Sequence, residues 1–305
     1  MTDRAPLVST SSPVFREAMA PTVSILHELE SAVAESSREH HYQPTADSRA
    51  MRELAAEAET YGQMSDWDGP IRDTHSLGGI TLLAAADYCR SFAVLFEGDR
   101  APTFGHLVIA RAALEASVIA GWLNEPAVEV PERIKRGLCE LMYSAMESRR
   151  LKIDPQDEAD RQRYWRSVID SFGWTFAQSN RNPVVDGVSR PSIPDGINDL
   201  LTGDRTLDVG RVQWSYLSSV GHVTWYGLRQ SIDAPVDSPL GRPVAAVGTT
   251  SRSAYAQALC VLRALRVAAT KRLVFMGWAD DAWLELCSRV TKHEAVLIQS
   301  SQPSA

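Results

Sequence analysis

Lysine is scarce in this sequence, and no segment is strongly basic. Only four of the 31 basic residues are lysine, Lys135, Lys152, Lys271 and Lys292, and the formal net charge is −7. A nucleic-acid-binding protein normally carries a basic stripe, because neutralising phosphates supplies most of its affinity. We therefore expect no nucleic acid as the main partner. The excess of arginine is best interpreted as codon usage in a GC-rich genome.

Cysteines and long apolar runs are few as well. Cys89, Cys139, Cys260 and Cys287 are far apart and form no C-x-x-C pair, which disfavours zinc sites and disulfides and favours a reducing cytoplasm. The most apolar segment, residues 80–96, is interrupted by two charged residues, so no membrane span is expected. The N-terminus lacks the pattern of a signal peptide. The sequence predicts a cytoplasmic protein, and no membrane is expected as a partner.

Signature motifs of common enzyme classes are also missing. The sequence contains no G-x-G-x-x-G, no Walker phosphate loop, no G-x-S-x-G and no H-E-x-x-H. The Glu-x-x-His pair that di-iron helical bundles use does not occur either. We expect neither a metal nor another cofactor.

Helical patterns run through most of the chain. Apolar residues at steps of three and four, interrupted by Gly–Pro and Asp–Pro breaks, indicate helices. They are predicted near residues 13–36, 48–61, 76–97, 103–123, 131–152, 156–178, 207–231, 251–277 and 279–296. No alternating strand pattern is convincing. The predicted fold is all-α, a single multi-helix bundle of about nine helices over residues 12–297, with flexible tails at 1–11 and 298–305.

Two neighbouring helices carry unexpected charges. Arg111 and Glu115 lie on the bulky apolar face of helix 103–123, while Asp87 and Arg90 lie in the preceding helix. A short turn joins the two helices, and similar distances from that turn put all four residues at one height. We therefore predict one buried cluster of two acids and two arginines. It is either a structural ion network or a site in which an arginine holds a ligand and a carboxylate acts as base.

Helix 207–231 is the second candidate, because one of its stripes carries Ser218, His222, Trp225 and Tyr226 in place of Lys and Glu. Such a stripe suits a polar pocket wall, and an ordinary hydrogen-bonded histidine is the plainer alternative. Trp122, at the end of helix 103–123, is a further candidate for contact with a ligand. By contrast, the stripe of helix 131–152 that includes Arg133 is interpreted as an ordinary solvated face.

A helix with Arg111-x-x-x-Glu115 that ends in Trp122, followed by Ser218-x-x-x-His222, resembles bacterial all-helical proteins of unknown function. The resemblance spans about residues 76–231 and implies a fold more than an activity.

From these residues we predict a pocket that binds a hydrophobic or aromatic small molecule with a polar end. His222, Glu115 and Asp87 would be catalytic, if the protein is an enzyme of specialised metabolism. Arg111, Arg90, Trp122, Ser218, Trp225 and Tyr226 would contact the ligand. The alternative is an interaction or regulatory protein, for example a defence-associated one, whose charge cluster is structural. A homodimer is compatible with either hypothesis.

Overall fold

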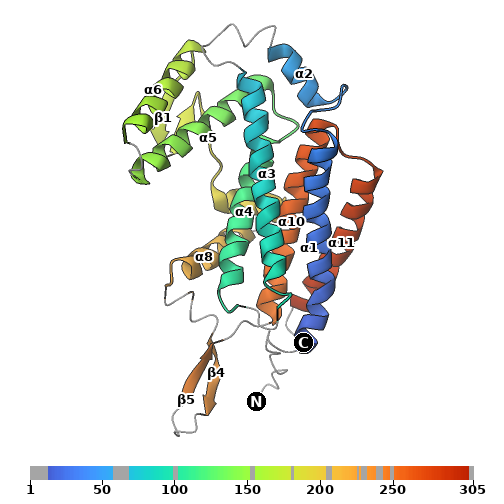
Figure 1. Ribbon diagram of the computed structural model, residues 1–305. Coiled ribbons are helices and arrows are strands. Elements are labelled where there is room, and N and C mark those ends of the chain that lie inside the picture. Colours follow the sequence, from blue (N-terminus) through green and yellow to red (C-terminus); the bar gives the residue numbers. More distant parts are fainter. Residues whose placement is uncertain are drawn as a thin grey trace.

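Three helices form the centre of the computed structural model: α3 (Pro70–Val94), α4 (Gly105–Leu123) and α10 (Ser251–Met276) (Figure 1). Helices α3 and α4 make the most extensive contact between any two helices. They approach closely because small residues meet there. Ala85 and Ala86 on α3, and Ala110 and Ala113 on α4, are each at most 2% exposed.

The structure describes residues 13–57, 69–98, 102–151, 155–179, 182–203, 208–224, 227, 232–237, 243–247 and 251–301. Within these ranges the prediction of a mostly helical bundle is confirmed.

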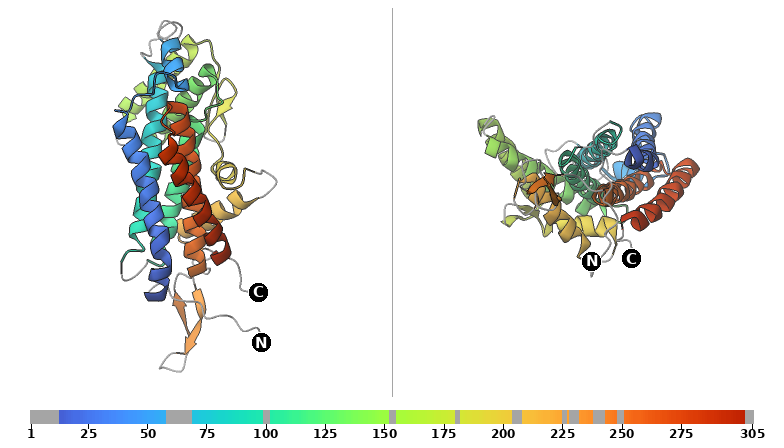
Figure 2. Two further views of the ribbon diagram at one scale, coloured as in Figure 1. Left: turned by 90° about the vertical axis from the view of Figure 1, so that its right-hand side faces the viewer. Right: turned by 90° about the horizontal axis from the view of Figure 1, so that it is seen from below.

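Long helices at both ends of the chain cover the central three. α1 (Pro13–Glu39) packs on α3 and α10, and α11 (Asp281–Ser301) packs chiefly on α10 (Figure 2). The helical period predicts one apolar face on α10, and that face is buried: Ala258, Leu262, Leu265, Ala269, Leu273 and Met276 are each at most 1% exposed. Helical periodicity therefore predicted this interface correctly.

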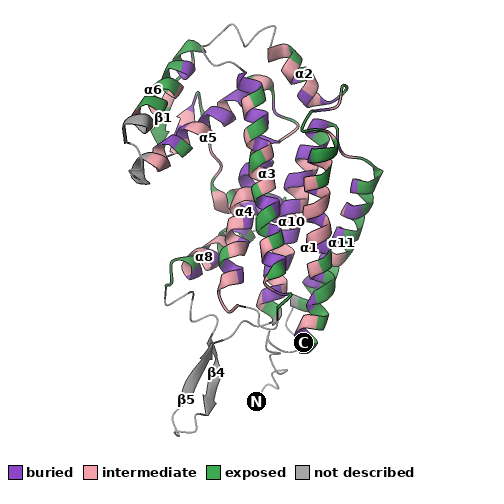
Figure 3. Ribbon diagram, viewed as in Figure 1, coloured by how far each residue is buried: buried purple, intermediate pink, exposed green. Residues whose placement is uncertain are grey.

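A second, smaller core lies beside the first. It is formed by α5 (Val130–Leu151), α6 (Pro155–Ser171) and the antiparallel strands β1 (Phe176–Ser179), β2 (Asn182–Val185) and β3 (Val188–Ser189). Ile71 at the start of α3 belongs to this core, and half-buried Trp122 packs against both cores. Figure 3 shows the buried residues following the central helices and α5.

Several boundaries differ from the prediction. Short α2 (Arg49–Ala56) begins after Ser48, whose hydroxyl accepts a hydrogen bond from the Met51 amide, as in an N-cap. The predicted helix 156–178 ends at Ser171, and β1, β2 and β3 of the small sheet follow it. α7 (Ile193–Leu201) was not predicted. α8 (Val209–Gly221) ends ten residues before the end of the predicted helix 207–231. The strands were missed because they are too short for an alternating pattern to stand out.

A second hairpin was missed in the same way. β4 (Ile232–Asp237) and β5 (Pro243–Val247) pair antiparallel and extend beyond the end of the bundle (Figure 1). The irregular register at Ile232–Pro235 explains why no regular alternation marks this pair in the sequence.

Among the described helices, only α4 is long and apolar enough to cross a membrane. Most of it is buried inside the bundle, which is also the position of the central helix in a soluble helical protein.

Candidate functional site

The predicted four-residue charge cluster does not form. Asp87 and Arg90 are exposed. At 100° per residue, Asp87 lies nearly opposite the buried stripe of α3 that includes Cys89 and Phe92. The prediction was wrong because the two helices meet through their small residues, whereas we had placed the bulky face of α4 inward.

Arg111 and Glu115 do pair with each other, Nε to Oε1 at 2.7 Å, but at the surface of the bundle. Their side chains are 23% and 38% exposed. The Arg111 guanidinium also stacks 4.4 Å from the ring centroid of Trp214 and lies beside Gly221 at the end of α8. The pair therefore fastens α8 to α4, and the prediction of an enclosed charge cluster fails for it too.

The other predicted site residues are scattered. His222 is exposed at the C-terminal end of α8, and its backbone amide donates to the Ser218 carbonyl at 2.9 Å, as in any helix. No side-chain hydrogen bond joins these two residues in the described part of the chain. Trp225 and Tyr226 lie outside the described residues. Trp122 is half-buried, and its ring centroid lies 5.3 Å from the guanidinium carbon of Arg136 on α5.

A buried charge cluster exists elsewhere, where α2, α3 and α5 meet. Glu53 on α2 is 4% exposed and contacts three basic groups. His75 Nε2 lies 3.1 Å from Oε2, Arg133 Nε lies 2.6 Å from the same oxygen, and Arg49 Nε donates to Oε1 at 3.1 Å. The Arg133 contact is an ion pair without the alignment of a hydrogen bond. One buried carboxylate thus holds three helices together.

Arg133 is wholly buried, so its assignment to a solvated face was wrong. Its guanidinium donates to the carbonyl oxygens of Leu123 (2.8 Å) and Glu125 (3.0 Å), where α4 ends. It also stacks 4.1 Å from the ring centroid of Phe275. Free carbonyls at a helix end attract a cation, so the burial of Arg133 is compensated locally.

Arg272 on α10 is the unusual member of this region. It is 6% exposed, and its Nη1 donates to the carbonyl of His75 at 2.9 Å and to Oδ1 of Asn124 at 3.0 Å. None of the described carboxylates pairs with it. Its guanidinium lies 5.5 Å from the ring centroid of Trp278, which compensates its charge only in part.

Two adjacent glycines make room for this arrangement. A Cβ on Gly79 would stand 3.1 Å from Nη2 of Arg272, and a Cβ on Gly78 would stand 2.6 Å from Oδ1 of Asn124. The Asn124 side chain also donates to the carbonyl of Gly78 at 2.9 Å. The Gly78–Gly79 pair therefore lets α4 and α10 place polar groups against the backbone of α3.

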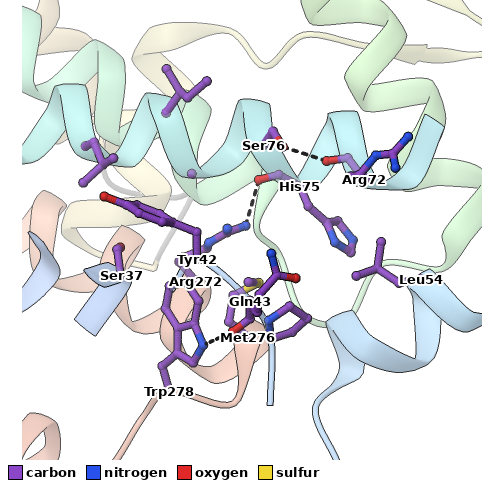
Figure 4. Close-up of a pocket in the computed structure, with 14 residues that line it drawn as sticks. Ser37, Tyr42, Gln43, Leu54, Arg72, His75, Ser76, Arg272, Met276 and Trp278 are labelled. Atoms are coloured by element: carbon purple, nitrogen blue, oxygen red, sulfur yellow. Dashed lines mark hydrogen bonds between the residues drawn. The ribbon is translucent and has the colours of Figure 1, made fainter. Parts of the chain in front are cut away.

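Arg272 and His75 border a pocket of about 400 Å³, within the range of small-molecule sites. We call it the Arg272 pocket. Its walls come from the end of α1, the turn that follows, α2, α3 and the end of α10; the lining residues are Ser37, Tyr42, Gln43, Pro44, Leu54, Arg72, His75, Ser76, Gly79, Ile80, Leu83, Arg272, Met276 and Trp278. Figure 4 shows the His75 imidazole and the Arg272 guanidinium on the same side of α3, facing Gln43, Met276 and Trp278.

The turn that closes one side of the pocket is fastened to the end of α10. Trp278 Nε1 donates to the Gln43 carbonyl at 2.9 Å, and the Thr45 amide donates to the Met276 carbonyl at 3.0 Å. Tyr42 has a φ of 60°, a conformation that is uncommon outside glycine. Strained backbone of this kind persists only where surrounding contacts hold it, and here those contacts shape the pocket wall.

Protonation in the cluster follows from burial and pairing. Burial lowers the pKa of His75 to about 4, against the smaller opposing effect of Glu53, so the imidazole is neutral at pH 7. Burial raises the pKa of Glu53, but the contacts with His75, Arg133 and Arg49 lower it by more, so the pKa lies below its usual value. Because an ionised carboxylate can only accept, His75 Nε2 carries the proton and Nδ1 is left as an acceptor.

Burial, with a contribution from nearby Arg133, lowers the pKa of Arg272 to about 9. The guanidinium is still charged at pH 7. Since burial disfavours this charge, any anion that reached Arg272 would relieve an existing electrostatic cost.

Sequence reasoning missed Glu53, His75 and Arg272 because they are far apart in the chain. The Arg272 guanidinium bonds to a residue 197 positions away. One local signal was present: two consecutive glycines in the middle of an apolar helix usually mark close approach by another group.

Within the described residues, no group of three or more His, Cys, Asp or Glu side chains is arranged to hold a metal ion. In the comparisons with known proteins, no family model, no curated protein and no solved structure matches this chain.

Proposed function

We propose that the protein binds a small molecule with an apolar or aromatic body and an anionic end in the Arg272 pocket. The carboxylate, sulfonate or phosphate of the ligand would contact Arg272, and the body would lie along the apolar wall.

One observation carries this proposal. Arg272 is only 6% exposed, yet no carboxylate among the described residues pairs with it. Buried charges are normally paired. Glu53 is the buried carboxylate of this region among the described residues, and it pairs with Arg49 and Arg133 rather than with Arg272. Glu129 also contacts Arg49, but it is 82% exposed and its charge is screened by solvent.

The remaining wall of the pocket suits an apolar body. Leu54, Leu83, Met276 and the ring of Trp278 line it, and Ile80, which is 66% exposed, stands at the opening. A mostly apolar cavity with a few convergent polar groups is the usual form of a small-molecule site.

The ligand class is the one expected from the sequence, hydrophobic with a polar end, but a different arginine holds it and the site lies between different helices. The proposal needs neither a metal nor a nucleotide. It is compatible with an enzyme of specialised metabolism and with a ligand-responsive regulatory protein, since both begin with binding in this pocket.

Three probes that share one ring test the proposal. We expect 1-naphthalenesulfonate to bind, and 1-naphthalenemethanol and 1-naphthylmethylammonium to bind at least tenfold more weakly, when measured by isothermal titration calorimetry. A charge-assisted hydrogen bond contributes about 1.5–3 kcal/mol, or roughly 10- to 150-fold in affinity.

The variant R272Q should lose the preference for the sulfonate. Its matched control is K271Q, which removes the neighbouring positive charge of the same helix, paired with Glu125 at 2.7 Å and outside the lining of the pocket. Equal binding of the anionic and cationic probes, or an unchanged preference in folded R272Q, would overturn the proposal. That result would favour the interaction-protein alternative.

A further inference from the structure

We infer that anion binding at Arg272 is coupled to the uptake of one proton by His75, so that the pocket binds anions more tightly as the pH falls. The inference rests on the proposed function and adds a mode of regulation to the same site.

The geometry places His75 between the proposed anion and the buried carboxylate. Its carbonyl accepts a hydrogen bond from Arg272, and its imidazole contacts Glu53 and borders the pocket. The ring also packs edge-on against Phe275, with 4.8 Å between centroids. The Nδ1 atom has no hydrogen-bond partner among the described residues, and it is the ring atom that a second proton would occupy, since Nε2 contacts Glu53.

The charged groups around His75 come from four helices. Glu53 and Arg49 are on α2, Arg72 on α3, Arg133 on α5 and Arg272 on α10. Burial is the largest cause of the low pKa of His75, and Coulomb repulsion from Arg272 and Arg133 lowers that pKa further. A bound anion offsets the charge of Arg272, which removes part of the repulsion that keeps His75 neutral.

A competing effect is the loss of water when a ligand fills the pocket, since desolvation disfavours the charged imidazole. That effect is small here because His75 is already only 6% exposed. An anion about 6 Å from the ring, at an effective dielectric constant of about 20, raises the pKa by about two units. Electrostatic attraction therefore exceeds the added desolvation.

The affinity change follows from the two pKa values. With a pKa of about 4 in the free protein and about 6 in the complex, binding should be about tenfold tighter at pH 5 than at pH 8. At pH 6 the complex should take up about half a proton. A sulfonate is the right probe, because its own charge does not change over this range.

The test is calorimetric titration with 1-naphthalenesulfonate at pH 5, 6, 7 and 8, with the fold checked by circular dichroism at each pH. At pH 6 the titration is repeated in buffers of different ionisation enthalpy, which counts the protons taken up by the wild-type protein without any variant. H75Q should bind with an affinity that changes less than twofold from pH 5 to pH 8. H40Q is the matched control, since His40 stacks on Trp278 with 5.4 Å between centroids but does not line the pocket.

Arg272-dependent binding with the same Kd at pH 5 and pH 8, and no proton uptake at pH 6, would overturn the coupling and leave the proposed function standing. Full pH dependence in folded H75Q would overturn it as well. No binding of the sulfonate at any pH, or binding unaffected by R272Q, would instead refute the proposed function itself.

Discussion

The carboxylate of Glu53 lies 2.6 Å from Nε of Arg133, a side chain with no exposed surface. A pair at this depth is costly to break, because the remaining charge cannot return to water. Here the remaining charge would also face Arg49 and the dipole of His75.

E53Q should therefore lower the free energy of unfolding by about 3–5 kcal/mol. The measurement is urea denaturation at pH 7. The matched control is E129Q, which removes the other carboxylate that contacts Arg49 but is 82% exposed, and should change stability by less than about 0.5 kcal/mol. Similar effects of the two substitutions would show that the buried cluster is not a stabilising centre.

The stability of the protein should fall as the pH drops from 6.5 toward 4. Burial lowers the pKa of both His75 and His106 to about 4, so the unfolded chain binds protons in this window and the folded chain does not. Stability is present in full above the unfolded pKa of about 6.5 and is lost below it, by up to roughly 3 kcal/mol for each histidine.

His106 offers a direct test of this dependence. Its Nδ1 donates to the Pro102 carbonyl at 2.9 Å, while its Nε2 is buried near Phe92 and Phe96 without a hydrogen-bond partner in the described structure. Leucine fits this apolar surrounding and gives up only the bond to Pro102. H106L should reduce the slope of unfolding free energy against pH by up to about 1.4 kcal/mol per pH unit between pH 6 and pH 5. Urea denaturation at pH 7, 6 and 5 measures it, and an unchanged slope would contradict the assignment.

The surface charges that the sequence singled out should matter little. D87N and R90Q should each change stability by less than about 0.5 kcal/mol, since both residues are exposed. R111A should cost about 1 kcal/mol, because it removes the Glu115 ion pair and the stack on Trp214. Thermal denaturation of the three variants provides the comparison, and a large loss in D87N would argue against the exposed position of that residue.

Gly78 should be intolerant of a side chain. Alanine normally stabilises a helix interior by up to about 1 kcal/mol relative to glycine. At this position its Cβ would stand 2.6 Å from Oδ1 of Asn124, and that amide also accepts from Arg272. We expect G78A to destabilise by about 1–3 kcal/mol. S76A, at an exposed position of the same helix, is the control, and a stabilised G78A would refute the close approach.

Much of the fold could be read from local patterns. The six apolar positions of α10 from Ala258 to Met276 all proved buried, because one helix period determines which residues share a face. The paired strands β1–β3 and β4–β5 could not be found in this way. Strands of two to six residues repeat too few times for their period to be recognised, and tertiary contacts stabilise them.

The position of the site depended on tertiary packing that no local pattern in α4 could predict. Helix α4 is apolar almost all round, so its sequence left open whether its small or its bulky face would be covered, and Arg111 was placed on the wrong side. Which face is buried depends on how closely a neighbouring helix can approach, and the alanines of α3 decide that.

The sequence by itself thus determined a helical bundle without the motifs of nucleotide or zinc-protease sites. Only the tertiary structure decided that Glu53, His75 and Arg272 meet beside one pocket. Contacts between residues up to 197 positions apart leave no local pattern, since their energy depends on the packing of separate helices rather than on the spacing of residues within one.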